Sequence, residues 1–200
     1  MHLYISTTDV TKYHLIQTIK PSHTQYDLDF TPYNLVSLND EQLTLNMSNQ
    51  ELIRFSNAVR ESTLKRLKQV PPGFENWKIV TDSLSIAEIA KHILDSDNWL
   101  FEKFDNEALP SITPELNSFF IADRNEFNLL LDELSDSGKK RAELIASMKA
   151  QDFNYVIFDD RFDGKVTKWW IIVRGNIDHE IHHRGQIALY LKVLQGQNKY

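Results

Sequence analysis

The sequence predicts an all-α protein built from four long amphipathic helices. Helix-capping patterns stand at the starts of long segments, and apolar residues recur behind them at the three- and four-residue spacing of one helix face. Proline and glycine mark where several of these segments end. Residues 48–200 are expected to form one helical bundle, with a small extended or hairpin excursion before the last helix. Residues 1–47 show no sustained period and are expected to form an extension packed on the bundle.

The first two helices begin with Ser-x-x-Glu capping boxes, at residues 48–51 and 85–88. The run Pro71-Pro72-Gly73 ends the first helix, and Leu84 is placed to pack on Ile89 at the start of the second. The first apolar face comprises Leu52, Phe55, Val59 and Leu67, and the second comprises Ile86, Ile93, Trp99, Leu100 and Phe104.

The third helix is predicted to start at Thr113-Pro114-Glu115, since proline is favoured at the first helical position. A separate short helix is expected over residues 139–148. Alternating apolar and polar residues over 153–166, around Asp163-Gly164, predict the hairpin. The last helix should run from about residue 167 to about residue 194, roughly 40 Å at 1.5 Å per residue. The third apolar face comprises Leu116, Phe120, Phe127, Leu130, Leu131 and Leu134.

The run His179-Glu180-Ile181-His182-His183 indicates the chemistry. Residues four apart lie on the same face of a helix, so His179 and His183 can direct their imidazoles at one ion. A metal site that acts on water or on a substrate usually takes three protein ligands and leaves one position open. A third ligand is therefore needed from elsewhere in the chain.

The third ligand is expected to be His92. The run matches the His-Glu-x-x-His pattern of zinc proteases, in which a downstream residue completes the site. This chain has no His, Asp or Glu after His183, which excludes that arrangement. Among the other histidines, His182 points about 100° away from its neighbour, and the remaining three lie in the irregular N-terminal stretch, at His2, His14 and His23. His92, in the middle of the second helix, is left.

Composition excludes several classes of function. The net charge of −6 and the lack of a basic patch argue against nucleic acid or an anionic membrane as the main partner. No apolar run approaches the roughly 18 residues of a membrane span and no signal pattern is visible, so a soluble, cytoplasmic protein is expected. The absence of cysteine excludes thiolate ligands and a cysteine nucleophile. Any thiol chemistry must therefore use a thiol that the substrate brings.

Two stretches resemble the DinB-like superfamily, also called the YfiT-like putative metal-dependent hydrolases, which includes thiol-dependent S-transferases. They are residues 85–100, which contain His92, and residues 178–187, with the core His-x-x-His-His-Arg-Gly-Gln. The resemblance covers about residues 48–196. It implies a four-helix bundle in up-down-down-up order, often dimeric, with a three-histidine metal site. The family's ligands fall on His92, His179 and His183.

The sequence therefore predicts a metal-dependent enzyme that acts on a small molecule. Three neutral imidazoles leave a divalent ion with its full charge, which can lower the pKa of bound water or bind a thiol as thiolate. Zinc or nickel is expected first, with iron or copper as further candidates. The enzyme is either a low-molecular-weight-thiol S-transferase or a hydrolase that uses metal-bound water. Glu180 is a candidate base, or forms an ion pair with Arg184, and His182 is a candidate proton shuttle at the pocket mouth.

Two alternatives stay open. A non-catalytic bundle could keep the three histidines as a structural, sensory or vestigial metal site. A di-iron carboxylate protein needs two Glu-x-x-His motifs, and only residues 180–183 fit that pattern. A homodimer is also expected, because the last helix carries apolar residues on more than one side. These residues are Trp169, Ile172, Val173, Ile177, Ile181, Ala188, Leu191 and Leu194.

Overall fold

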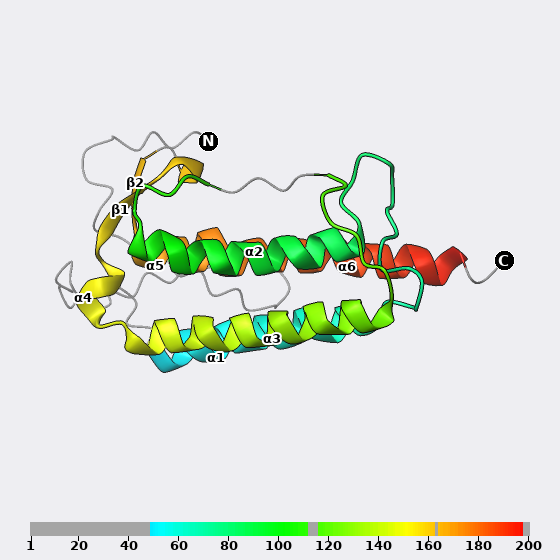
Figure 1. Ribbon diagram of the computed structural model, residues 1–200. Coiled ribbons are helices and arrows are strands. Elements are labelled where there is room, and N and C mark those ends of the chain that lie inside the picture. Colours follow the sequence, from blue (N-terminus) through cyan, green and yellow to red (C-terminus); the bar gives the residue numbers. More distant parts are fainter. Residues whose placement is uncertain (1–48, 112–115, 163, 198–200) are drawn as a thin grey trace, which may run out of the picture. The chain divides into compact units, whose positions relative to one another are not determined.

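The computed structural model describes residues 49–111, 116–162 and 164–197, and these are mostly helical (Figure 1). The predicted helical class is confirmed. The four long helices are α1 (Asn49–Leu67), α2 (Ile86–Asp105), α3 (Arg124–Ser147) and α6 (Asp178–Gln197). The shorter elements are α4 (Ala150–Phe153), β1 (Val156–Asp159), the 3₁₀ helix η1 (Asp160–Phe162), β2 (Gly164–Thr167), α5 (Lys168–Trp170) and the π-helix η2 (Ile171–Ile177). The predicted N-terminal extension lies outside the described residues.

The main contacts among the four long helices form a ring. Helix α1 packs against α3 and α6, and α2 packs against the same two helices. In Figure 1, α1 and α6 run in one direction, and α2 and α3 run in the opposite direction. Helices α2 and α6, which carry the candidate metal ligands, are therefore antiparallel neighbours.

The start of α2 follows the capping box that the sequence predicts. The backbone N–H of Glu88 donates to the Ser85 hydroxyl at 3.1 Å, and the backbone N–H of Ser85 donates to the Glu88 carboxylate at 2.8 Å. Leu84 packs against the apolar cluster that contains Ile89. Because both ends of the box are satisfied, the register of α2 is fixed from its first turn.

The third helix begins later and ends later than predicted. Its N-cap is Asp123, whose carboxylate accepts hydrogen bonds from the backbone N–H groups of Asn125 and Glu126. Leu116 and Phe120 precede this cap and are exposed, while Thr113-Pro114-Glu115 lies outside the described residues. The expected short helix over residues 139–148 is the continuation of α3, which passes through Gly138 without a break.

Gly138 is needed for the close packing of α3 on α1. A Cβ atom built at this position would lie 2.9 Å from Cγ of Arg60 on α1, so only glycine lets the two helices approach at this point. The glycine that separates two predicted helices in the sequence therefore serves close packing inside a single helix.

The predicted hairpin is confirmed. Strands β1 and β2 pair antiparallel, with Val156 opposite Thr167 and Asp159 opposite Gly164. The last helix ends later than expected, since α6 passes Gly196 and reaches Gln197. It is preceded by the π-helix η2, which the sequence pattern did not indicate.

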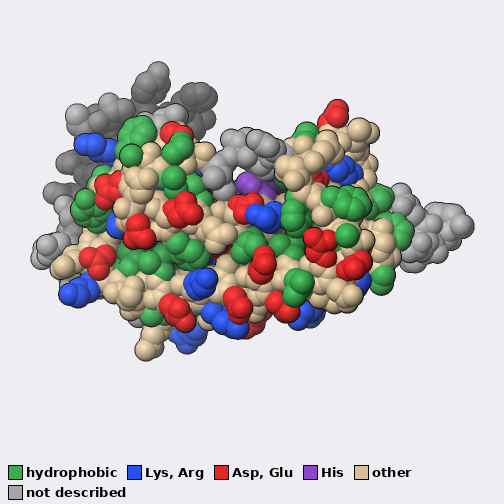
Figure 2. All heavy atoms as spheres, in the orientation of Figure 1, with side chains coloured by type: hydrophobic (Ala, Val, Ile, Leu, Met, Phe, Trp, Pro, Cys, Tyr) green, Lys and Arg blue, Asp and Glu red, His purple; other side chains and the backbone are tan. Residues whose placement is uncertain are grey.

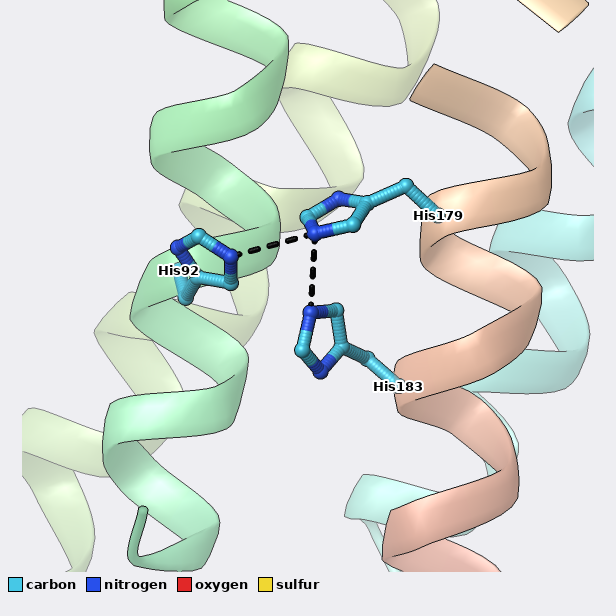
Figure 3. A group of neighbouring side chains, drawn as sticks. All are labelled: His92, His179 and His183. Atoms are coloured by element: carbon cyan, nitrogen blue, oxygen red, sulfur yellow. Dashed lines mark hydrogen bonds between the residues drawn. The ribbon is translucent and has the colours of Figure 1, made fainter. Parts of the chain in front are cut away.

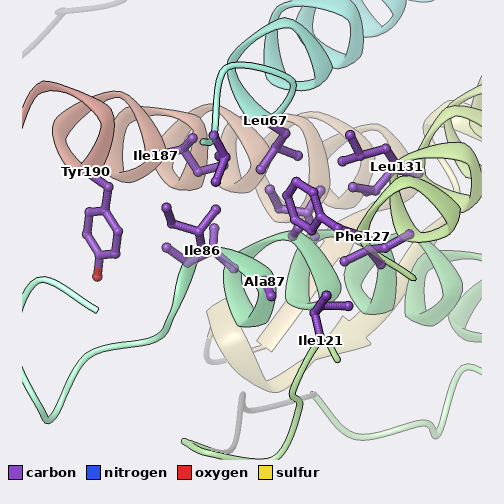
Figure 4. Close-up of a cluster of buried hydrophobic side chains, with 14 of the residues drawn as sticks. Leu67, Ile86, Ala87, Ile121, Phe127, Leu131, Ile187 and Tyr190 are labelled. Carbon is purple, nitrogen blue, oxygen red and sulfur yellow. The ribbon is translucent and has the colours of Figure 1, made fainter. Parts of the chain in front are cut away.

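Two apolar clusters form the core, and a polar layer separates them. Figure 4 shows the first cluster, which includes Leu67, Phe127 and Ile187. The second includes Leu52, Leu100 and Ile172. Buried polar residues occur on each long helix between the residues of the two clusters; they are Arg60, Thr63, Ser96, Asp97, Ser137, Arg141, Glu180 and His183. Two more, Ser56 and Asn176, lie among the residues of the second cluster. Among the described residues, no helix combines the length and apolar character that crossing a membrane requires.

Candidate metal centre

Three histidines from two helices converge on one point. His92 comes from α2, and His179 and His183 come from successive turns of α6 (Figure 3). The Nε2 atom of His179 lies 3.1 Å from Nε2 of His92 and 2.9 Å from Nε2 of His183. One ring nitrogen from each residue lies within 4.8 Å of the others. The structure thus brings together the three residues that the sequence predicts as ligands.

The three rings are held in the neutral form that a metal requires. Burial is the main cause, and it lowers the pKa of each imidazole below its ordinary value. The pKa of His179 falls to about 3, since the neighbouring rings and Arg161 add to burial. That of His183 falls to about 4, although its hydrogen bond to Gln186 opposes the shift. At neutral pH each of the three imidazoles is therefore uncharged and has one ring nitrogen without a proton, which can bind a metal.

Gln186 fixes which nitrogen of His183 faces the cluster. Its side-chain oxygen lies 2.8 Å from Nδ1 of His183 and accepts a hydrogen bond from the Nδ1–H group. Neutral His183 therefore keeps a lone pair on Nε2, the atom directed at His179. An acceptor on the outer ring nitrogen is the usual way in which proteins orient a histidine ligand.

Hydrogen bonds alone cannot satisfy the cluster. Nε2 of His179 carries at most one proton, so it can donate to His92 or to His183 but not to both. Nδ1 of His179 is buried and has no hydrogen-bond partner among the described residues. Two imidazole nitrogens bound to one zinc at roughly 2.0–2.1 Å lie about 3.3 Å apart in tetrahedral geometry, close to the two measured separations. The donor set therefore fits a divalent cation.

His182 lies outside the cluster. The residue is exposed, and its Nε2 lies 3.1 Å from the side-chain nitrogen of Gln186. Its ring is next to that of His183, with 5.1 Å between the centroids. This is the position of a residue at the rim, and it allows contact with solvent.

Glu180 lies neither beside a substrate pocket, as a base would, nor in an ion pair with Arg184. Its carboxylate is buried and accepts hydrogen bonds from Arg60 at 3.0 Å and from Arg141 at 2.9 Å. Its helical neighbour Arg184 is not the partner. Both carboxylate oxygens are occupied by arginines inside the bundle, which leaves none for a substrate. The structure therefore places the Glu180 carboxylate inside the core, and its role as a base stays a prediction.

The arginines join a second carboxylate, that of Asp97, which is close to Arg60 at 2.7 Å and to Arg141 at 3.0 Å. Asn176 completes the group and accepts from Arg141 at 2.9 Å. We call Arg60, Asp97, Arg141, Asn176 and Glu180 the polar core cluster. Burial alone would raise the pKa of Asp97, but the two arginines outweigh it and hold that pKa below the ordinary value.

A pocket of about 540 Å³ lies along α2 and has His92 in its lining. Its wall is mixed: Leu84, Trp99 and Phe119 contribute apolar surface, and Lys91, Asp95 and Glu102 contribute charge. Figure 2 shows histidine side chains inside a hollow on one face of the molecule. A small molecule in this pocket would lie beside one of the three convergent imidazoles.

The metal-free protein is expected to lose stability as the pH falls from about 6.5 towards 4. An unfolded histidine takes up its proton near pH 6.5, whereas burial keeps folded His179 and His183 neutral down to about 3 and 4. The unfolded chain therefore binds more protons in this window, and its free energy falls relative to the folded state. Urea unfolding of chelator-treated protein at about pH 7 and about pH 5 measures the difference, which His179→Leu should reduce. Equal free energies of unfolding in the wild type at both pH values would contradict this account.

Comparison with known proteins agrees with this description. The family model of the DinB superfamily matches residues 57–187. A DinB-like protein from Bacillus subtilis is similar in structure, at 20% sequence identity and a TM-score of 0.51, over 72% of this chain and 92% of that one. An uncharacterised protein from Clostridium difficile is similar at 14% identity and a TM-score of 0.56, over 74% of this chain and 97% of that one. At these identities the two structures show a shared fold. No curated protein matches the chain.

Proposed function

Because this chain belongs to the DinB superfamily and directs three neutral imidazoles at one point, we propose that it is a metal-dependent enzyme acting on a small molecule. The favoured reaction is transfer of a low-molecular-weight thiol to an electrophile, and hydrolysis is the second candidate. The observation that carries the proposal is the convergence of three Nε2 atoms beside a pocket. We also infer that the four long helices form the up-down-down-up bundle that the resemblance implies.

The proposed metal is zinc or nickel, with iron and copper as further candidates for an all-imidazole site. Bound there, the dication would stabilise a thiolate or hydroxide at neutral pH. The residues of the chain supply the rest: His92, His179 and His183 hold the ion, and Gln186 orients His183. Among the described residues the cluster has three members, which leaves a coordination position for a ligand from the pocket.

A non-catalytic metal site is the second candidate function. The observation that favours it is the position of Glu180, which is paired with two arginines inside the core and is not among the residues that line the pocket. His182 is then the exposed histidine beside the cluster that remains for proton transfer. A thiol S-transferase has less need of a base than a hydrolase, since coordination by the dication already favours the thiolate.

Thiol binding separates the two functions. When a small thiol is added to the cobalt-substituted protein, a thiolate-to-cobalt charge-transfer band is expected, because the chain has no cysteine to produce one itself. Consumption of the thiol by a model electrophile should require both the metal and His179. An unchanged spectrum would remove the basis for the transferase. If metal-dependent ester and amide hydrolysis were absent as well, the non-catalytic function would be the better account.

A homodimer is a further proposal, and it now depends on the resemblance. Four of the residues that suggested a spare apolar face are buried within the chain itself: Ile172, Ile177, Leu191 and Leu194. Exposed apolar side chains occur on the hairpin and the helix that follows it, at Val156, Phe158 and Trp170, and on α6 at Leu189. Light scattering at micromolar concentrations is expected to give twice the chain mass of 23.4 kDa. A mass of one chain would contradict the dimer and leave the metal centre unaffected.

A further inference from the structure

The polar core cluster connects all four long helices at one level. Arg60 comes from α1, Asp97 from α2, Arg141 from α3 and Glu180 from α6, and each is at most 4% exposed. Two positive and two negative side chains balance one another. Replacing such a group by apolar residues is often neutral or stabilising, so its contribution to stability does not by itself explain its presence.

Both arginines bridge the two helices that carry the histidines. Arg60 donates to Asp97 on α2 and to Glu180 on α6, at 2.7 and 3.0 Å. Arg141 donates to the same two carboxylates, at 3.0 and 2.9 Å. The planar guanidinium group holds its donors in a fixed fork, and two such groups side by side leave little freedom in the separation of α2 and α6.

The residues that form these bridges are close in sequence to the histidines. Glu180 directly follows His179 on α6, and Asp97 is five residues after His92 on α2. Asn176, three residues before His179, lies in the π-helix and donates to the Ser96 carbonyl at 3.1 Å and to Asp97 at 3.2 Å. His179 is thus flanked on both sides by side chains that are fixed to the polar core cluster.

The π-helix η2 is a second feature that orients α6. One π turn holds an extra residue and so changes the rotation of the helix that follows, and such turns are frequent at functional sites. Here the segment ends at Ile177, two residues before His179. Asn176 ties its last turn to α2, which fixes the angle at which α6 presents both of its histidines.

We propose that Glu180 and Asn176 are positioning residues for the metal centre, and that Arg60 and Arg141 act through them. The polar core cluster sets the separation of α2 and α6 and the rotation of α6, so that three Nε2 atoms meet without further movement. This inference rests on the proposed metal-binding function. In this proposal Glu180, the Glu of the His-Glu-x-x-His run, does not transfer protons. Its contacts with the arginines instead position the histidines of α6.

The test compares two carboxylates that flank His179. Glu180→Gln removes the buried charge, and Asp178→Asn makes the same chemical change at the preceding residue, whose carboxylate is about half exposed and pairs with Arg174 at 2.6 Å. For Glu180→Gln, cobalt or zinc affinity is expected to fall about 10- to 100-fold, the range typical of residues that orient metal ligands. The d–d absorption bands of the cobalt protein, which report coordination geometry, should also change. Asp178→Asn should keep both the affinity and the bands of the wild type.

Arg60→Lys is a second variant that keeps the charge balance and is therefore expected to fold. A lysine cannot span both carboxylates as the guanidinium does, so a smaller loss of affinity with the same spectral change is expected. Folded Glu180→Gln and Arg60→Lys proteins with wild-type affinity and bands would overturn the proposal. If the wild type itself binds no metal, the proposed function fails. The positioning role is then tested on the metal-free protein by the ¹⁵N NMR signals of its imidazoles. Glu180→Gln must then shift the His92 and His179 signals, and unchanged signals would overturn the positioning role.

Discussion

Replacing His92, His179 or His183 by alanine is expected to remove most of the bound metal. Each ring supplies one of three ligands, and two imidazoles cannot hold a divalent ion as tightly as three. The loss should be largest for His179, whose Nε2 is close to both other rings. Metal content after dialysis, measured on protein purified without an affinity tag, gives the result directly.

His182→Ala is the matched control for these variants. It removes a neighbouring histidine from the same helix, but one that is exposed and outside the cluster. It should keep the metal content of the wild type. Equal metal content in the wild type and the His92→Ala variant would end the assignment of the third ligand to α2.

Arg141→Met is expected to cause the largest loss of stability, about 3–5 kcal/mol in the free energy of unfolding. Arg141 is fully buried and binds Asp97, Glu180, Asn176 and Ser56. Methionine fills much of the space but leaves two buried carboxylates to share a single arginine. The cost comes from the uncompensated negative charge in the core. Urea unfolding followed by circular dichroism measures it.

Lys139→Met tests whether this loss reflects burial of the charge. The residue lies on the same helix, two positions earlier, and pairs with Asp136 at the surface. Because exposed ion pairs contribute little, its free energy of unfolding should equal that of the wild type. A similar loss in both variants would contradict the role that we give to the polar core cluster.

The sequence predicted the features that depend on local patterns. The capping box at Ser85 and Glu88 formed as expected, because its two hydrogen bonds need only neighbours in the chain. The hairpin followed from alternation around a turn. The convergence of His92 with the pair on α6 was reached by eliminating the other histidines, and it required no knowledge of how the helices pack.

The errors arose where packing decides between local alternatives. The sequence predicts a separate short helix after residue 138, but the approach of Arg60 requires a glycine at Gly138 and the helix continues. Thr113-Pro114 satisfies the rule for a helix start, yet the described helix begins at the cap that Asp123 provides. Glu180 matched the base of a protease motif, and its actual partners are distant in sequence. Rules based on spacing along one helix carry no information about such partners.

One signal of the polar core cluster was present in the sequence. Arg60 lies between Ser56 and Thr63, and all three have the spacing of the apolar stripe of α1 rather than of its exposed face. Asp97 interrupts the apolar residues of α2 in the same way. A charge of each sign inside two apolar stripes indicates a buried pair. The partners could not be assigned, because the order in which helices pack is not a local property.

X-ray absorption at the zinc edge of the zinc-loaded wild type is the most direct test of the central claim, a three-histidine site with one open position. The account predicts three imidazole nitrogens at about 2.0–2.1 Å with one further light atom, and a single sulfur at about 2.3 Å after a thiol is added. A shell of four protein ligands that the thiol leaves unchanged would contradict the open site, and a fit without three imidazoles would contradict the site itself.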